Sequence, residues 1–302
     1  MKAVVLHQYG GPEELKYEDF PEPTPGPGEV LVRVHAASIN PVDWKMRSGA
    51  AKERFPVTFP GVLGRDVAGT VEQLGEGVTG FAVGDQVLAV TWATYAELCI
   101  VKAAELSKMP EGLDFTDAAA VPLVALTGQQ LITLGAKAQR GETILLSGAL
   151  GSVGRCALFT ALELGVNVIA GVRKHQIAEA LALGAAQAID LADEDAIRGL
   201  GHVDAVADTI GHHTGTLLLD TVRPGGNFGS VVGPPAGAVD YPNVHVHAFM
   251  AHPDAATVVH FAEAVFDSRL KLPIGLILPL SKAGEGQTAA EKEGSGKVVL
   301  TP

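Results

Sequence analysis

The sequence predicts an α/β protein in which a β-rich domain is combined with a doubly wound parallel sheet. Near position 145 an apolar run leads through a glycine-rich turn into a helical pattern, and helices and strands then alternate as far as residue 249. Before residue 120, short strand patterns are separated by turns. The first arrangement is typical of parallel strands joined by crossover helices, and the second is typical of a compact β domain.

The first 120 residues contain a series of short strand patterns. The segment 21–28 holds four prolines, which have no N–H to donate and therefore exclude regular structure. Glycines at 75, 77, 80 and 84 mark turns between the later strands. We expect strands over residues 1–7, 29–35, 67–74 and 86–90, with a short, partly alternating segment at 15–20. Helical segments are expected at 117–120 and 127–134.

A phosphate-binding turn is expected in the middle of the chain. Ile144–Leu146 shows no polar alternation, as in a strand buried on both faces, and residues 155–164 have a helical pattern. Glycine backbone and a helix N-terminus suit a pyrophosphate, because free N–H groups and a partial positive charge meet there. A strict dinucleotide fingerprint would have glycine at Ala149, so a glycine-rich turn of another βαβ unit stays open as the alternative. The predicted cofactor contacts are Gly148, Leu150, Gly151, Ser152, Val153 and Gly154.

The end of the second strand, residues 167–171, indicates which dinucleotide binds. An NAD site places a carboxylate there to bond the ribose 2′-OH. This chain instead has Arg173, Lys174 and His175, with no carboxylate between Glu163 and Glu179. At ~4 Å and an effective dielectric of ~20, a cation–phosphate charge pair is worth on the order of 4 kcal/mol before desolvation and screening. The alternative is a solvated basic turn; we predict NADP(H).

Beyond Arg173 the pattern keeps the rhythm of a doubly wound sheet. Helices are expected over 176–183, 216–222, 254–269 and 283–293, and strands over 188–190, 203–208, 227–233, 243–249 and 297–300. The last strand comes too late for the parallel sheet, so we expect it to return to the first domain. The predicted domains are residues 1–122 with 253–302, and residues 123–252.

Composition limits the partners. The 302 residues carry a formal charge of −12, which argues against nucleic acid or an anionic membrane. No apolar run approaches the roughly 18 residues of a membrane span, and the first residues look like a strand rather than a signal peptide. Two cysteines provide neither a disulfide framework nor a metal knuckle. We therefore expect a cytoplasmic protein with a small-molecule partner.

Collinear motifs cover almost the whole chain, at residues 37–45, 60–69, 81–87, 121–128, 147–154, 208–211, 223–226 and 296–300. Together they resemble the medium-chain dehydrogenase/reductase superfamily, most closely its zinc-independent quinone oxidoreductase branch with zeta-crystallin-like and alkenal reductases. The resemblance implies a GroES-like catalytic domain built from both ends of the chain, a Rossmann domain between them, and a cleft for nicotinamide and substrate.

The resemblance also bears on zinc. In zinc-dependent relatives a Cys, a His and a Glu stand where this chain has Asn40, Arg65 and Asp66. An amide and a guanidinium cannot replace a thiolate and an imidazole as ligands, and the four-cysteine structural lobe has no counterpart here. The histidines of 212–213 and 245–247 are more commonly structural or exposed. We predict no metal.

Without a metal, the easier hydride acceptors delocalise the incoming charge themselves, as quinones, enones and enals do. The resemblance brings Asn40 and Lys45 close to the nicotinamide, with Lys45 as oxyanion donor or proton source. A solvated lysine and an asparagine that only holds backbone are the alternatives. Trp92 and Tyr95 could line the substrate side; the alternative, which is the commoner one, is that they are buried aromatic residues. Further cofactor contacts implied by the resemblance are Thr127, Ser230, Val231, Val232, Phe249 and Lys297.

Two functions follow as hypotheses. The first is an NADPH-dependent, zinc-independent reductase of quinones or α,β-unsaturated carbonyl compounds. The second is a noncatalytic NADPH-binding protein with a structural or sensory role. The alternating segment 243–249 could pair with its two-fold copy, as in family dimers, so we expect a homodimer. The alternative is an unpaired strand edge that its histidines protect.

Overall fold

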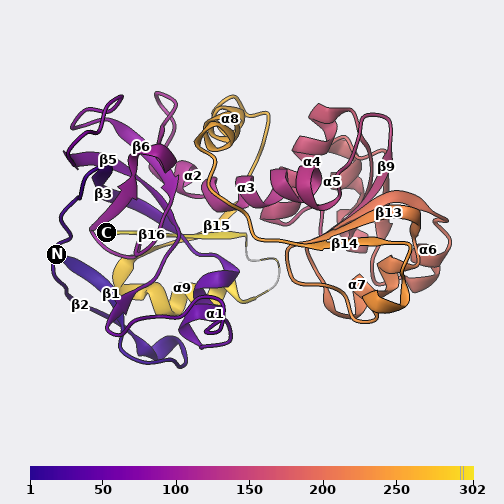
Figure 1. Ribbon diagram of the computed structural model, residues 1–302, viewed down its shortest axis with the longest axis horizontal. Coiled ribbons are helices and arrows are strands. Elements are labelled where there is room, and N and C mark those ends of the chain that lie inside the picture. Colours follow the sequence, from indigo (N-terminus) through magenta and orange to yellow (C-terminus); the bar gives the residue numbers. More distant parts are fainter. Residues whose placement is uncertain (293, 295) are drawn as a thin grey trace. The chain divides into compact units, whose positions relative to one another are not determined.

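The computed structural model describes residues 1–292, 294 and 296–302 (Figure 1). Its contacts divide the chain into two units, Met1–Leu123 with Pro253–Pro302, and Val124–His252. We call them the terminal unit and the central unit. None of the helices formed by the described residues is both long and apolar enough to span a membrane.

The terminal unit is built on a sheet with strand order β15-β16-β3-β5-β6-β8, and β7 also pairs with β3. A second sheet has the order β2-β1-β4. The strands are β1 (Lys2–Leu6), β2 (Leu15–Asp19), β3 (Glu29–Ser38), β4 (Gly61–Val62), β5 (Asp66–Leu74), β6 (Gln86–Val90), β7 (Leu98–Lys102), β8 (Ser107–Lys108), β15 (Ile274–Pro279) and β16 (Lys297–Thr301).

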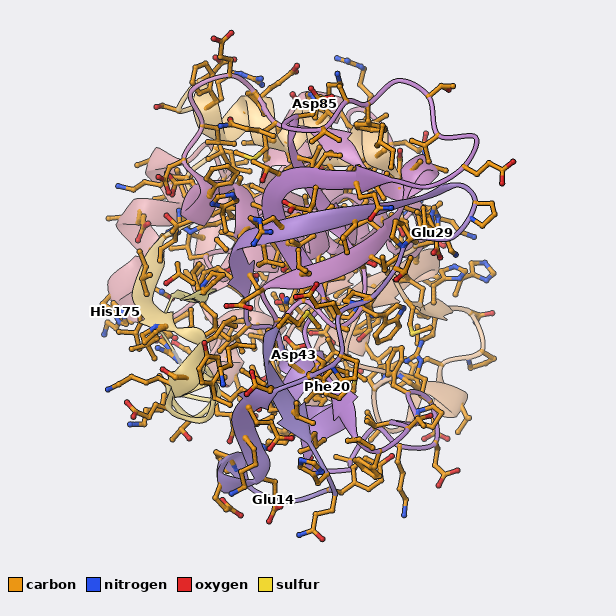
Figure 2. All side chains as sticks on the ribbon, turned by 90° about the vertical axis from the view of Figure 1, so that its left-hand side faces the viewer. Glu14, Phe20, Glu29, Asp43, Asp85 and His175 are labelled. Carbon is orange, nitrogen blue, oxygen red and sulfur yellow. The ribbon has the colours of Figure 1, made fainter. Side chains whose placement is uncertain are left out.

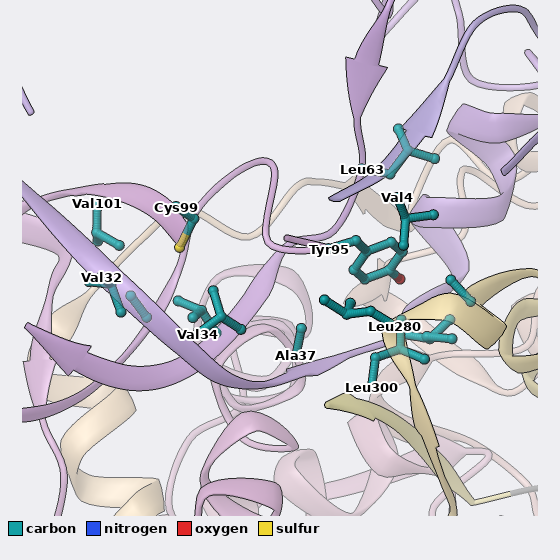
Figure 3. Packing of buried hydrophobic residues seen from close by; sticks show 14 of the residues in the cluster. Val4, Val32, Val34, Ala37, Leu63, Tyr95, Cys99, Val101, Leu280 and Leu300 are labelled. Atoms are coloured by element: carbon teal, nitrogen blue, oxygen red, sulfur yellow. The ribbon is translucent and has the colours of Figure 1, made fainter. Parts of the chain in front are cut away.

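The end of the chain completes this sheet. In β16, Val299 pairs with Ser38 and Leu300 with Ala37, both antiparallel. This pairing confirms that the terminal strand returns to the first part of the chain. Alternate β3 residues face an apolar core, in which Tyr95 packs close to Val4 and Leu280 (Figure 3). Burial of these side chains supplies the main stabilising free energy of the unit.

Helices and short 3₁₀ turns cover the terminal sheets. The helix α1 (Pro41–Arg47) was not predicted. Its start nevertheless carries two helix signals, a proline in the first turn and Asn40 as N-cap. The predicted helix 254–269 is shorter, and the predicted helix 283–293 ends earlier; residue 293 itself lies outside the described residues. The remaining elements are α2 (Phe115–Ala119), α8 (Ala255–Phe266), α9 (Ala283–Ala290), η1 (Pro12–Glu14), η2 (Ala103–Glu105) and η6 (Leu280–Lys282).

The central unit contains a six-stranded sheet with the order β11-β10-β9-β12-β13-β14. Every neighbouring pair in it is parallel. This is the strand order of a doubly wound dinucleotide-binding sheet, so the predicted fold class is confirmed. The strands are β9 (Thr143–Ser147), β10 (Asn167–Val172), β11 (Gln187–Asp190), β12 (Val203–Asp208), β13 (Val222–Ser230) and β14 (His245–Ala248).

Helices cover both faces of the central sheet (Figure 1). Ile144 and Leu146 of β9 pack in a cluster with residues of α4 and α5, whereas Leu145 packs with residues of α6 and α7. The unbroken apolar run of β9 therefore serves two cores at once. The helices are α3 (Pro122–Gln130), α4 (Ser152–Leu164), α5 (Ile177–Ala182), α6 (Glu194–Arg198) and α7 (His212–Leu219), with the π-helical turn η3 (Leu131–Gly135) and the short turns η4 (Lys174–Gln176) and η5 (Ala238–Asp240).

Two predicted elements of the central unit are displaced. The helix expected over 216–222 is α7, which starts four residues earlier and ends three residues earlier, and the strand expected over 227–233 begins at Val222. Pro224, Gly225 and Gly226 lie within β13 and do not interrupt it, because the register between β12 and β13 shifts there and accommodates the additional residues of β13. The helix α6 and the strands β7 and β15 were not predicted.

Candidate active site

Two positions of the glycine turn in the central unit, Gly148 and Gly154, have no room for a side chain. Gly148 has φ +64, and a Cβ there would lie 2.4 Å from Thr209 Oγ1. A Cβ on Gly154 would lie 2.0 Å from the Gly148 carbonyl oxygen. Ala149 is fully buried in the core and donates its N–H to Gly171 O, which explains why alanine is accepted there.

The same turn opens onto the start of α4. Gly151 is the N-cap and has no side chain that could accept from the first N–H groups of the helix. Its own N–H donates to Gly148 O at 2.9 Å, which closes the turn. Ser152 and Val153 are half-buried beside it. A tight turn with bare backbone and uncapped helical N–H groups fits a pyrophosphate.

A buried carboxylate that was not among the predicted site residues organises this edge of the sheet. Asp208, at the end of β12, is fully buried; Ser147 Oγ donates to its Oδ1 at 2.7 Å and Ser230 Oγ to its Oδ2 at 3.2 Å. The N–H groups of Ile210 and Gly211 also donate to Oδ1, each at 3.0 Å. Asp208 thus ties together the ends of β9, β12 and β13. Its place at the carboxyl end of a parallel strand was the available signal.

Three of the predicted nicotinamide contacts, Ser230, Val231 and Val232, lie next to this carboxylate. The Val231 N–H donates to Asp208 O at 3.2 Å, and the Val232 N–H donates to Ser230 Oγ at 3.2 Å. Phe249 follows β14 and donates its N–H to Ser230 O at 3.4 Å. Thr127 is half-buried in α3. All these residues, like those of the glycine turn, belong to the central unit.

The basic segment follows β10 directly. Arg173, Lys174 and His175 are exposed, and His175 is labelled at the surface in Figure 2. A carboxylate that was not among the predicted site residues lies on the neighbouring strand: Asp190, at the end of β11, is in register with Val172, the last residue of β10. One of its oxygens accepts the Ala192 N–H at 3.1 Å.

In the terminal unit two of the other predicted residues, Asn40 and Lys297, meet at a buried ion pair. Lys297 Nζ donates to Asn40 Oδ1 at 2.8 Å and lies 3.5 Å from Asp66 Oδ2. Asn40 Nδ2 donates to Asp66 Oδ2 at 2.8 Å, and Ser38 Oγ donates to the same oxygen at 2.6 Å. The Leu123 N–H donates to Asp66 Oδ1. Both ends of the Asn40 amide are therefore occupied, and its side chain is only 2% exposed.

A second buried carboxylate fixes the start of α1. Asp43 Oδ2 accepts the Asn40 N–H at 2.7 Å and the Tyr95 hydroxyl at 2.8 Å (Asp43 is labelled in Figure 2). Asp43 Oδ1 has no hydrogen-bond partner among the described residues. Burial raises the pKa of Asp43 to about 7. Tyr95 is fully buried, so it anchors α1 and does not line an open substrate surface.

A cavity of about 330 Å³ opens beside α1 in the terminal unit. The Arg65 guanidinium stacks 3.6 Å from the centroid of the Trp92 ring and donates from Nε to Thr91 O at 2.8 Å. Burial lowers the pKa of Arg65. Lys45 is exposed on α1 and immediately precedes Met46, a residue of the cavity wall, in the sequence. The wall includes Met46, Arg54, Phe55, Val57, Leu63 and Trp92.

Within the part of the chain that the structure describes, no group of three or more His, Cys, Asp or Glu side chains is arranged to hold a metal ion. His213 contacts Glu194 at 3.1 Å, and His247 contacts Asn227 at 3.2 Å.

Comparison with known proteins places the chain in a family. Residues 26–111 match the model of the alcohol dehydrogenase GroES-like domain. A quinone oxidoreductase of Pseudomonas aeruginosa is 38% identical over 249 residues, which are 78% of this chain and 75% of that protein. A 2-haloacrylate reductase of a Burkholderia species is 33% identical and covers 74% of this chain and 71% of its own length.

Solved structures agree over the full length. A quinone oxidoreductase from Coxiella burnetii superposes with a TM-score of 0.90 at 29% identity, covering 100% of this chain and 99% of its own. A mycobacterial protein solved in complex with NADPH gives a TM-score of 0.82 at 27% identity, covering 100% of both chains. The chain is therefore an oxidoreductase that belongs to the medium-chain dehydrogenase/reductase superfamily, among the quinone oxidoreductases.

Proposed function

We propose that this protein is an NADPH-dependent reductase of quinones or α,β-unsaturated carbonyl compounds that works without a metal. The observation that carries the proposal is the exposed Arg173-Lys174-His175 segment directly after β10. In a doubly wound sheet this is where the adenosine ribose is read, and cations there favour a 2′-phosphate over a free hydroxyl. The NADPH complex of the mycobacterial relative supports this choice.

The central unit supplies the rest of the cofactor site. Gly148, Gly151 and Gly154 leave the turn without side chains at the approach to α4, where a Cβ on Gly154 would meet backbone. Asp208 holds Ser230 and the following residues at the same sheet edge. When bound, the reduced nicotinamide supplies a hydride. Thr127, Val231, Val232 and Phe249 remain the proposed contacts of its ring.

The acceptor is proposed to lie in the cavity of the terminal unit. Phe55 and Trp92 offer planar apolar surface, with ring centroids 5.9 Å apart, as suits a quinone or a conjugated enone. Negative charge then collects on the acceptor oxygen, and a hydrogen-bond donor stabilises it. The exposed ammonium group of Lys45 is the proposed donor and proton source.

Asn40 and Lys297 receive a positioning role in this proposal. Their polar atoms are engaged with each other and with Asp66, so neither presents its polar group to an acceptor. The network fixes the entry to α1 and hence the place of Lys45. The positions that hold zinc in related enzymes are thus filled by an amide that is already bonded and by an arginine stacked on Trp92, which supports metal-independent catalysis.

The test is NADPH consumption with a small panel of acceptors. A naphthoquinone and an enal should be reduced, and a saturated aldehyde should not. Turnover of the aldehyde that rises on addition of zinc would contradict metal independence. Tight NADPH binding without turnover of any acceptor would favour a noncatalytic NADPH-binding protein.

The proposed assembly is a cytoplasmic homodimer formed through β14. This strand is the edge of the central sheet and pairs only with β13 among the described strands. An edge strand has unpaired backbone groups, which a second copy can satisfy by two-fold pairing. Light scattering should therefore give twice the chain mass. A monomer at micromolar concentration would contradict the dimer.

A further inference from the structure

One arginine connects the glycine turn with the segment that follows the basic residues. Arg155 lies in the first turn of α4, and its side chain is 8% exposed. Its Nε donates to Leu150 O at 3.1 Å, inside the glycine turn. Its Nη2 forms an ion pair with Glu179 Oε1 on α5. A single guanidinium therefore joins the predicted pyrophosphate turn to α5, the helix that follows the predicted 2′-phosphate-binding residues.

The negative charge of Glu179 is close in the sequence to the predicted 2′-phosphate-binding residues. It is the first carboxylate after Arg173 in the sequence and lies in the first turn of α5. Its side chain is 51% exposed, so it can reorient in solvent once its partner is lost. A free carboxylate near the 2′-phosphate would oppose the attraction of Arg173 and Lys174.

The orientation of the Leu150 carbonyl group affects cofactor binding for a different reason. A backbone carbonyl that turned toward the pyrophosphate would repel it, whereas N–H groups attract it. The bond from Arg155 Nε holds the Leu150 carbonyl oxygen on the Arg155 side of the turn. This contact concerns the diphosphate, which NADPH and NADH share, and not the 2′-phosphate, which only NADPH carries.

We propose that Arg155 is a positioning residue with two separable effects on cofactor binding. Through Leu150 it shapes the turn for the pyrophosphate of either dinucleotide. Through Glu179 it holds a carboxylate away from the 2′-phosphate and so sets part of the preference for NADPH. The second effect rests on the proposed use of NADP(H).

Direct binding of both dinucleotides separates the two effects. Kd values for NADPH and NADH are measured by titration calorimetry for the wild type, Arg155→Met, Glu179→Gln and the double variant. Arg155→Met should weaken both dinucleotides and, in addition, reduce the NADPH preference roughly three- to tenfold, since Glu179 is released. Glu179→Gln should keep the preference at the wild-type value or above. The double variant should have an NADPH/NADH preference within about twofold of that of Glu179→Gln. It should still bind both dinucleotides more weakly than the wild type, because the Leu150 carbonyl still lacks its hydrogen bond from Arg155.

Two further variants separate this role from a loss of stability. Arg47→Met removes another buried arginine, which pairs with Glu291 in the terminal unit, and should leave the NADPH/NADH ratio unchanged. Arg155→Lys keeps the positive charge beside Glu179, so it should preserve the ratio within about twofold while both Kd values rise, and it serves if Arg155→Met does not fold. Asp190 is unchanged in all variants, so any effect of its carboxylate on the NADPH/NADH ratio is the same in each and cancels when the ratios are compared.

The contrary outcomes are distinct. A wild type that binds NADPH no more tightly than NADH contradicts the proposed cofactor and the Glu179 effect with it. A wild type that prefers NADPH, with the same preference in Arg155→Met, contradicts the Glu179 effect alone. Unchanged NADH affinity in both Arg155 variants contradicts the Leu150 effect.

Discussion

The ammonium nitrogen of Lys297 lies 2.8 Å from the amide oxygen of Asn40, although 257 positions separate the two residues in the sequence. Asp66 completes the group and is fully buried. A lone buried charge is costly, so the ammonium and the carboxylate depend on each other. The contact joins β16 to the start of α1 and makes the position of Lys45 depend on the end of the described chain.

Replacing Lys297 by methionine should destabilise the protein by about 3–5 kcal/mol, because Asp66 then keeps a buried charge without its cation. Denaturant unfolding measures the effect. Adding Asp66→Asn should recover part of the loss. Lys282→Met removes an exposed lysine paired with Glu285 and should cost less than about 1 kcal/mol. An unshifted unfolding midpoint in Lys297→Met would show that the pair contributes nothing.

Asp43 predicts a pH dependence of stability. Its pKa is about 7 in the folded protein against an ordinary value of 3.8, because burial disfavours the charged carboxylate. Between these values the unfolded chain loses a proton that the folded protein keeps, so the contribution of Asp43 to stability falls as pH rises from about 4 to about 7. The stability of the wild type relative to Asp43→Asn should therefore drop by on the order of 1–4 kcal/mol over this window and level off above it. Unfolding curves at several pH values test this, and a difference that stays constant would contradict it.

The basic segment predicts cofactor choice. Exchange of Arg173 and Lys174 for alanine should weaken NADPH binding by roughly tenfold for each cation removed and leave NADH binding nearly unchanged. Fluorescence titration with both dinucleotides gives the ratio. Arg198→Ala, which removes an exposed arginine of α6, is the matched control and should have no effect. An unaltered preference in the double variant would remove the main support for NADP(H).

Lys45 predicts a selective loss of turnover. Lys45→Met should lower kcat with a quinone roughly 100-fold while the Kd of NADPH stays the same, because only the charge on the acceptor oxygen loses its donor. Lys52→Met, another exposed lysine close by in the sequence, should leave kcat unchanged. If both variants keep full activity, the proton comes from water.

Gly154 predicts a steric effect in the turn. The Cβ of Gly154→Ala would lie 2.0 Å from the Gly148 carbonyl oxygen, so the backbone must shift. We expect a destabilisation on the order of 2–3 kcal/mol and loss of dinucleotide binding. In Gly151→Ala the nearest atom is 3.3 Å away, and unfolding should change by less than about 1 kcal/mol. Equal stability of the two variants would contradict this view of the turn.

The sequence predicts the features that local patterns control. The apolar run of β9 and the glycine turn depend on neighbouring residues, and the structure has them where expected. The alternation of helices and strands is also present, although α7 and β13 begin earlier than expected and α6 was not predicted. The alanine at position 149, where the fingerprint has glycine, is explained only by the structure, in which its methyl group is part of the core. The assigned roles of Asn40, Lys45 and the cofactor contacts stay predictions.

The features that were missed depend on contacts between distant residues. Asp43 and Tyr95 are 52 positions apart, and only the folded sheets bring the hydroxyl to the carboxylate. Asp190 is brought level with Val172, the residue before the basic segment, by the register of β10 and β11, which no sequence window contains. The early start of β13 likewise depends on pairing with β12, which outweighs the turn preference of Pro224-Gly225.

The place of β16 between β15 and β3 also governs the order of events during protein synthesis. Residues 124–252 leave the ribosome as one continuous piece and contain every strand of their own sheet, so they can fold while translation continues. The other sheet lacks an interior strand until residues 297–301 emerge. Ribosome-bound chains halted shortly before that point should already protect the dinucleotide-binding sheet from proteases while the surrounding segments remain open to cleavage.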